Sequence, residues 1–440
     1  MSNTLEKMNV SDFLVSAIEQ NKNNTPVTAH IQDLQKLALA EFSRQEGLPH
    51  RKNEEYKYSP VASLFKTELT IGGVTDTKKN NQELEKLGIP GLDANLITLI
   101  NGELQEDQLS AGKKQSFQVQ NLKSLVSKPS ALFTEHFGKY ALPASDPFIA
   151  LNTAAFRDVL FITIPDQMVL DKPILILNIT DVSAPSLISP RILIHAGRNA
   201  SAEIIEMFAS TGSGEAVFTN SLSEIVVEEQ ARVLFYKIQD RCEKLNLLST
   251  TQVIQGAKSH FDTHTVTLSG DWVRNNLNIV PDAQYCETHL NGLFILKGNQ
   301  HTDNHTLVDH RKPNCESNQL YRGILDGKSS GVFNGKIFVR PDAQKTNAYQ
   351  SSKNMLLSDG ASINTKPQLE IYADDVKCSH GSSTGQIDEN ALFYLRARGI
   401  GTESARALLL IAFAKDVINT IRIDALRLHV ESLIEERLTK

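Results

Sequence analysis

Short apolar segments dominate the middle of the chain and define its expected fold. They are rich in β-branched residues, and no segment of helical periodicity separates them. From about residue 157 they read VLFITIP, PILILNI, RILIHAG, AEIIEMF, SEIVVEE, ARVLFYKIQ, HTVTLSG and KIFVRP. Because βαβ units place a helix between successive strands, this pattern argues against them and predicts a mainly β architecture.

Turn markers that end in alanine recur between these segments. Ala231, Ala257 and Ala283 close three of them, and their positions differ by 26 residues twice over. Two further markers end at Ala343 and Ala361. Recurrence of this kind predicts a β-solenoid, in which each coil buries its inner face against its neighbours. The alternative interpretation is a sandwich or barrel built from regular hairpins.

Helical patterns lie before the β region. Apolar residues at helical spacing predict a helix over 31–42. Ser59 followed by Pro60 is typical of an N-cap with proline at the first helical position. A domain boundary is then indicated by the turn-forming residues Pro143, Asp146 and Pro147. We therefore expect a mainly helical region over residues 1–150.

Helical periodicity returns after the β region. Asp388 is expected to cap a helix over 389–398, with Gly399 as the glycine that ends it. Two further amphipathic patterns follow it toward the C-terminus. The expected organisation is thus a β core at 151–385 and a C-terminal helical domain at 386–440.

Composition narrows the class of protein. Apolar residues make up 40% and charged residues 22% of the 440 residues, and the formal net charge is −6. These values fit a globular protein and give no indication of nucleic acid or an anionic membrane as a partner. We see no signal-peptide pattern and no apolar run long enough to span a bilayer, so we expect a cytoplasmic protein. Its four cysteines show no metal-binding spacing and are interpreted as thiols.

Common catalytic motifs are missing from the sequence. The segment from Gly323 to Ser329 resembles a phosphate-binding loop, but three residues separate its glycines where four are required. We interpret it as a turn between strands, and we expect no ATP hydrolysis by this chain. No serine-hydrolase elbow, zinc-protease motif or dinucleotide fingerprint is present either.

Potential metal ligands are densest between residues 301 and 315. They are His301, Asp303, His305, His310 and Cys315, whose spacing matches no zinc motif. We interpret them as polar residues on the outer face of a coil rather than as a metal site. His260 and His264 receive the same interpretation.

A second pair of ligand types stands at the end of the β region. In an extended strand Val376, Cys378 and His380 share one face. A thiol and an imidazole are too few for a closed metal site. Asp374, Asp375 and the following glycine and serines indicate a polar rim, where a thiol has little reason to be packed.

The residues around this pair resemble a known family. The run ADDVKCSHGSSTGQIDENALFYLRARGI, with NAYQSSKNMLLSDGASINTKPQLEIY before it, is similar to the C-terminal signature of the SufB/SufD family of iron–sulfur cluster assembly proteins. The segment RKNEEYKYSP resembles the family's N-terminal Trp-Lys-Tyr element, with Tyr56 in place of tryptophan. SufB chains typically carry an acidic run where this chain has Cys378 to Gly381, so the resemblance lies on the SufD side.

This resemblance implies a fold and a complex. The family has a right-handed parallel β-helix between two helical regions. SufD-like chains pair with SufB through the β-helix ends, and each recruits one SufC subunit, an ABC-type ATPase, through its C-terminal helices. Residues 386–440 would then dock SufC, through the region that includes Phe393, Tyr394, Arg396, Arg398 and Gly399.

The resemblance also implies a role for the two ligand residues. A transient iron–sulfur cluster would form at the SufB–SufD interface, with His380 as one metal ligand and Cys378 as a weaker candidate. The chain would be a non-catalytic scaffold subunit that supports iron acquisition and binds no cofactor stably by itself. An incomplete set of metal ligands on this chain agrees with a cluster site that two chains share at their interface.

Two other functions stay open. One is a carbohydrate-active β-helix enzyme, which would need clustered carboxylates along one coil face and usually an export signal. The other is a homodimeric structural protein without a metal role, and homodimer formation in isolation is also compatible with the SufD-like interpretation.

Overall fold

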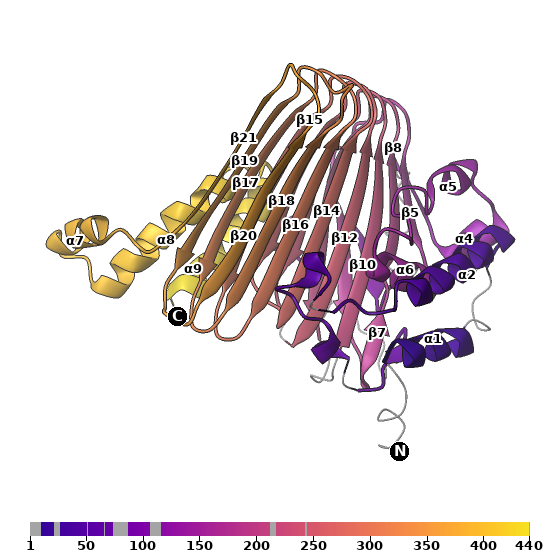
Figure 1. The fold of residues 1–440 in the computed structure, drawn as a ribbon, viewed down its shortest axis with the longest axis horizontal. Helices are drawn as coiled ribbons and strands as arrows, with labels where there is room; N and C mark the ends of the chain where they lie inside the picture. The colour runs from indigo at the N-terminus through magenta and orange to yellow at the C-terminus, as the bar shows by residue number, and fades with distance from the viewer. Residues whose placement is uncertain are drawn as a thin grey trace.

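A computed structural model describes residues 10–21, 27–50, 52–65, 67–73, 87–105, 116–211, 217–242 and 244–439. Two long sheets, stacked face to face, form its body (Figure 1). Successive coils place one strand in each sheet, which makes a β-solenoid of about 7 turns. The mainly β prediction and the solenoid are therefore confirmed, together with helices at both ends of the chain.

Parallel pairing joins most neighbouring strands, as in a solenoid. The first sheet, sheet A, contains β1 (Thr70–Ile71), β4 (Gln118–Gln120), β5 (Leu160–Ile164), β7 (Ser186–Ile188), β8 (Arg191–Ala196), β10 (Val217–Val227), β12 (Leu245–Gln255), β14 (Trp272–Pro281), β16 (His301–His310), β18 (Ser330–Val339) and β20 (Ser362–Ile371). The second, sheet B, contains β2 (Asn95–Ile100), β3 (Glu103–Leu104), β6 (Ile174–Thr180), β9 (Ser201–Ser210), β11 (Arg232–Gln239), β13 (His260–Thr267), β15 (Glu287–Leu296), β17 (Glu316–Leu325), β19 (Asn347–Leu356) and β21 (Lys377–Gly385).

A repeated turn sets the length of the coils. The turns before β9, β11, β13, β15, β17 and β19 each have a non-glycine residue at φ between 56° and 62°, followed by a small buried residue. The first set is Asn199, Gln230, Lys258, Tyr285, Asn314 and Lys345, and the second is Ala200, Ala231, Ser259, Cys286, Cys315 and Thr346. Their spacings, by subtraction, are 31, 28, 27, 29 and 31 residues. The 26-residue recurrence of alanines therefore marks turns but does not equal the coil length.

Apolar side chains from the inner faces of both sheets fill the solenoid. The core includes Ile194, Ile225 and Val253 on sheet A and Phe235 and Phe261 on sheet B, all buried. Burial of each such side chain contributes about 1.5–3 kcal/mol to folding. Because a coil can bury this face only between two others, the stack is stable as a unit and its last coil remains open unless something covers it.

Helices precede and follow the solenoid in the chain. The N-terminal set comprises α1 (Val10–Asn21), α2 (Ala29–Arg44), the 3₁₀ turns η2 (Glu54–Tyr56) and η3 (Ala62–Leu64), α4 (Leu122–Ser127), α5 (Ala131–His136) and α6 (Pro147–Ala155). The C-terminal set comprises α7 (Glu389–Ala397), α8 (Thr402–Ile418) and α9 (Asp424–Thr439). The first four strands also lie within the N-terminal region, since β1, β2 and β4 pair with β7, β6 and β5.

Three local predictions can be compared with the structure. Asp388 caps α7 by accepting from the backbone N–H groups of Asn390 and Ala391, as expected. Ser59 does not cap a helix, because η3 begins only at Ala62 and has Val61 at its N-cap. The Gly323–Ser329 segment is the end of β17 and the turn into β18, as expected.

All four cysteines are free thiols, and three of them are buried. Cys286 and Cys315 belong to the column of small turn residues described above, which accounts for their burial. Within the described ranges, none of the helices combines the length and the apolar character that a membrane crossing requires.

Candidate functional site

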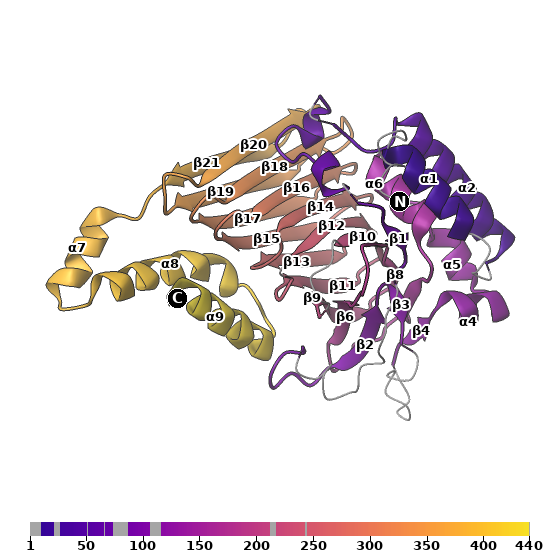
Figure 2. The same cartoon turned by 90° about the horizontal axis from the view of Figure 1, so that it is seen from below.

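The solenoid ends in two strands with free outer edges. In the part of the chain that the structure describes, β20 pairs only with β18 and β21 pairs only with β19. Figure 2 shows both strands at the end of the stack, away from the N-terminal helices. Every residue of β21 except Cys378 is exposed. This end therefore presents unpaired backbone N–H and C=O groups, the usual template for adding a strand from another chain.

His380 and Cys378 both lie on β21. Alternation along the strand places them on one face, and the register pairs Cys378 with Ala348 and His380 with Gln350. Gln350 points into the solenoid, where its amide donates to Gln319 at 2.7 Å, so this face is the inner one. His380 is exposed because no further coil covers it. The imidazole thus stands at the open end of the solenoid interior.

Cys378 has a more apolar environment than His380. It packs at the margin of a cluster formed by Ile337, Val339, Ala343, Ala348 and Ala373. Burial raises the pKa of the Cys378 thiol, which favours the neutral form. Because the thiolate is the form that binds metal, Cys378 is the less suitable ligand of the two.

The C-terminal helices divide into an attached pair and a projecting helix. α8 and α9 pack on the outer face of sheet B, in a cluster that includes Tyr236, Val266, Leu293, Val417 and Leu426. The guanidinium of Arg322 also pairs with Asp416 on α8 at 2.8 Å. α7 extends away from the body in both views (Figures 1 and 2). The helical pair is therefore part of the folded body, while α7 is held mainly through α8.

α7 exposes the residues expected at a partner surface. Phe393 is 72% and Tyr394 58% exposed, the highest exposures among the large apolar residues of this helix. Arg396 and Arg398 are also exposed, and Arg398 donates to the Tyr394 hydroxyl at 2.8 Å. Gly399 has φ of 85° and ends the helix, as its predicted role requires. Aromatic residues with arginine are the usual composition of an interface hot spot.

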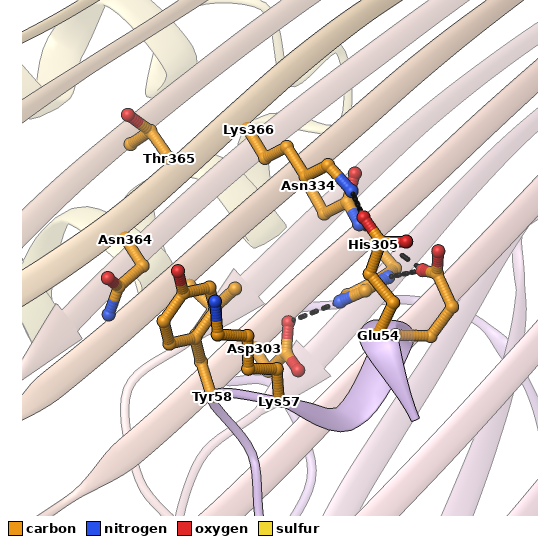
Figure 3. Close-up of a pocket in the computed structure, with 11 residues that line it drawn as sticks. Glu54, Lys57, Tyr58, Asp303, His305, Asn334, Asn364, Thr365 and Lys366 are labelled. Carbon is orange, nitrogen blue, oxygen red and sulfur yellow. Dashed lines mark hydrogen bonds and ion pairs between the residues drawn. The ribbon is translucent and has the colours of Figure 1, made fainter. Parts of the chain in front are cut away.

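The ligand-rich segment from residue 301 to 315 does not form one site. His301, Asp303 and His305 lie on the outer face of β16, beneath the N-terminal segment that contains η2 (Figure 3). His310 is buried and pairs with Ser317, and Cys315 is a turn residue. The structure thus brings three of the five together. Outer-face positions were predicted for all of them, and this holds for the first three.

A buried carboxylate connects these three residues to the N-terminal segment. Asp303 is 1% exposed and accepts from Arg274 at 2.7 Å, from His305 and from the Ser59 hydroxyl. Arg274 stacks on the Tyr56 ring, 4.0 Å from its centroid, and donates to the backbone carbonyl of Glu55. Ser59, expected to cap a helix, instead contributes to this network. The network explains why Tyr56 and Ser59 occupy their positions: they fasten the segment to the solenoid.

Beside the network lies a pocket of about 360 Å³. Figure 3 shows Lys57, Tyr58, Asn364 and Lys366 around it, with His305 at its floor. Lys366 pairs with Glu54 across the opening. Most of its polar groups already have protein partners, so the arrangement is better explained as attachment of the segment than as a substrate site.

Replacing Arg274 by methionine is expected to loosen the N-terminal segment. Methionine keeps the apolar contact with Tyr56 but leaves Asp303 buried without its guanidinium, and breaking a buried pair costs about 3–5 kcal/mol. Hydrogen exchange of residues 52–65 should accelerate accordingly. Lys366→Met is the matched control, because its ion pair with Glu54 joins the same segment but is exposed. Equal exchange in both variants would contradict the network's role.

The same attachment is expected to depend on pH. Burial lowers the pKa of His305, but the Asp303 charge and the hydrogen bonds to Asp303 and Glu55 together outweigh burial, so the pKa lies above its ordinary 6.5. The hydrogen bond from His305 lowers the pKa of Glu55 below 4.5. The contribution of His305 is therefore complete below 6.5 and is lost as pH rises through the raised pKa. Denaturation from about pH 5 to about pH 8 should show the protein and His305→Gln converging in stability. A gap that widens with pH would refute this.

The fold and the open edge define a β-solenoid protein whose last coil has free strand edges. Comparison with known proteins gives its family. Residues 178–413 match the family model described as SUF system FeS cluster assembly, SufBD core domain, and residues 16–176 match the SufBD protein N-terminal region. The chain therefore belongs to the SufB/SufD family and has a role in iron–sulfur cluster assembly.

Individual relatives agree with this assignment. The chain is 28% identical to the iron–sulfur cluster assembly protein SufD of Escherichia coli, over 96% of this chain and 94% of the relative. It is also 28% identical to an iron–sulfur cluster assembly SufBD family protein of Synechocystis, over 94% and 96%. SufD of Bacillus subtilis is 23% identical, over 88% and 92%. The relatives named SufD support the SufD side of the family that the sequence predicted.

Proposed function

We propose that this chain is a non-catalytic scaffold subunit that pairs with SufB and recruits the SufC ATPase in a complex that builds iron–sulfur clusters. The observation that carries the proposal is the open solenoid end, with its free strand edges and the exposed His380. Family membership supplies the process, and the geometry supplies the surfaces through which the chain would take part in it.

Pairing with SufB takes place at β20 and β21. A partner strand adds to each free edge through main-chain hydrogen bonds, and side chains of the last coil provide specificity. An isolated chain has the same edges available to a second copy of itself, so a homodimer through this end is the expected state without SufB. Addition of SufB should convert it to the heterodimer, which size-exclusion chromatography with light scattering would detect.

His380 supplies one ligand to the cluster, which is the cargo of the complex. A neutral imidazole is a known ligand type for such clusters, and the remaining ligands come from SufB. Cys378 is an accessory thiol at most, because its burial disfavours the thiolate. The isolated chain offers too few ligands to retain a cluster.

SufC docks on the projecting helix α7. Phe393 and Tyr394 supply the apolar contact, and Arg396 and Arg398 add charge next to it. ATP hydrolysis then belongs to SufC, in agreement with the lack of a phosphate-binding loop in the sequence. The four free thiols are compatible with the cytoplasm as the site of action.

The proposal is tested by anaerobic reconstitution. Three samples are supplied with ferrous iron and a sulfide source: the chain alone, SufB with SufC from the same source, and all three subunits together. We expect a visible cluster chromophore only in the heteromeric complex, and only while the three subunits co-elute. A chromophore of equal intensity in SufB–SufC without this chain would overturn the scaffold role.

A further inference from the structure

Two histidines and two carboxylates form a square on the outer face of sheet B. His260 and Asp262 lie two residues apart at the start of β13, and Glu287 and His289 lie two residues apart at the start of β15. The register pairs His260 with Glu287 and Asp262 with His289. Alternation and register together place all four side chains on the same face at neighbouring positions.

Three of these residues have the composition of a metal site. His260 Nδ1 lies 3.2 Å from one Glu287 oxygen, and His289 Nε2 lies 3.8 Å from the other. One ligand atom from each of the three lies within 4.8 Å of the others. Two imidazoles with one carboxylate suit a divalent first-row transition metal and leave coordination positions open. The half-exposed Glu287 gives the metal access from solvent.

The fourth residue, Asp262, occupies the position of an orienting group. Its Oδ1 lies 2.8 Å from His260 Nε2 and 2.7 Å from His289 Nδ1, so it contacts the ring nitrogens that do not face Glu287. Metal-binding histidines commonly donate the second ring N–H to a carboxylate, which fixes the ring and its tautomer. Asp262 is buried and is itself held by Arg422, which is 3.2 Å from its Oδ2.

We propose that His260, Glu287 and His289 bind a single divalent transition metal, with Asp262 as the positioning residue behind the two imidazoles. On the basis of the proposed function, we assign ferrous iron as the metal that occupies this site in the cell. A groove of about 690 Å³ runs from Asp262 and His289 to Ser379, the neighbour of His380. His289 on β15 and Ser379 on β21 are three strand spacings apart, or about 14 Å. The site thus lies on the outer face of sheet B, about 14 Å from the edge strand that carries His380 on its inner face.

A second ligand group provides a matched comparison. His136, His195 and Glu228 also lie within 4.8 Å of one another. The two histidine pairs have similar ring geometry, with centroids 5.1 Å apart at 35° for His136 and His195 and 5.5 Å apart at 48° for His260 and His289. His136 and His195 are both buried, however, which limits the access of a metal ion from solvent. His136 Nδ1 is also 2.6 Å from the Tyr140 hydroxyl. We therefore expect this group to bind metal more weakly than the square on sheet B.

Anaerobic titration of the full-length chain with Co²⁺ tests the site. We expect one equivalent to bind with ligand-field absorption in the visible range. Because losing even an orienting group typically costs 10–100-fold in metal affinity, Glu287→Gln and His289→Gln should each weaken binding at least about tenfold. Asp262→Asn should weaken it by about 10–100-fold, and Glu228→Gln should leave it unchanged.

Three outcomes would overturn the site. They are unchanged affinity in both Glu287→Gln and His289→Gln, equal loss in Glu228→Gln, and no stoichiometric Co²⁺ binding by the unmodified chain. Circular dichroism of each variant checks its fold. Glu287→Gln is the most secure variant, because the side chain is half-exposed and the amide has the same shape.

The assignment of iron is tested separately in the reconstituted complex. With Glu287→Gln, cluster assembly should be several-fold slower at limiting Fe²⁺ and normal at excess Fe²⁺. Equal rates at limiting Fe²⁺, in a variant that has lost Co²⁺ binding, would reject iron as the occupant. If the unmodified complex assembles no cluster, the proposed function fails while the Co²⁺ result still decides the site.

Discussion

Replacing His380 by alanine is expected to reduce cluster assembly by the reconstituted complex at least about 10–100-fold, since loss of an outer-shell residue alone has effects of that size. His380 is exposed at the open end, so its replacement should leave the fold of this chain and the main-chain pairing of β21 with SufB intact. The variant should therefore co-elute with SufB and SufC normally. Chromophore absorbance and iron content per complex are the measurements.

Neighbouring residues on β21 provide the controls for His380. Ser379→Ala alters an exposed side chain on the opposite face and should assemble clusters normally. Cys378→Ser should have a much smaller effect than His380→Ala, because the Cys378 thiol is held neutral. Normal assembly by an intact complex that contains His380→Ala would remove this residue from the cluster site.

The double replacement of Phe393 and Tyr394 by alanine is expected to abolish SufC binding by this chain. Hot-spot side chains typically contribute 2 kcal/mol or more each, so their joint loss corresponds to a weakening of about 30-fold to 1,000-fold. Both side chains are exposed on α7, so their removal should not disturb the solenoid. Pull-down and calorimetric titration with SufC give the affinity, and the heterodimer with SufB should form as before.

A point replacement is a sharper test of docking than removal of residues 386–440. That deletion would also take away α8 and α9, which cover Tyr236, Val266 and Leu293 on sheet B. The exposed apolar face would itself cause aggregation. Leu142→Ala is the matched control, because Leu142 is 52% exposed on the N-terminal region. Unchanged SufC affinity in the double variant would place the dock on another surface.

The arrangement of strands followed from the sequence because the inner face of each coil is apolar. Residues such as Ile225, Val253 and Phe261 recur in short segments without intervening helices, and a stack of coils buries them between its two sheets. The coil length was harder to obtain. It is set by a turn residue at positive φ followed by a small buried residue, and those positions accept alanine, serine, cysteine or threonine. Because the residue type at these positions varies, the repeat is not apparent in the sequence.

The network around Asp303 and the residue group on sheet B could not be predicted, because both depend on contacts between segments that are distant in the sequence. Ser59 reads as a helix cap, yet it bonds to Asp303, 244 positions later. His260 was interpreted as a polar surface residue, and Glu287 and His289 were overlooked. The sequence pattern that identifies them is His-x-Asp on one coil and Glu-x-His on the next. This pattern can be recognised only when the register of β13 and β15 is known. His380, by contrast, could be selected as a candidate ligand from the residues next to it in the sequence.

The free edges of β20 and β21 have a consequence for the amounts of protein in the cell. An edge pairs with one strand at a time, so under the proposed function self-association and binding of SufB would be mutually exclusive and would compete by mass action. A surplus of this chain would be stored as homodimer, whereas a shortage would leave SufB without its counterpart. The apparent affinity for SufB then falls as the concentration of this chain rises, and balanced synthesis of the two subunits becomes a condition for efficient assembly.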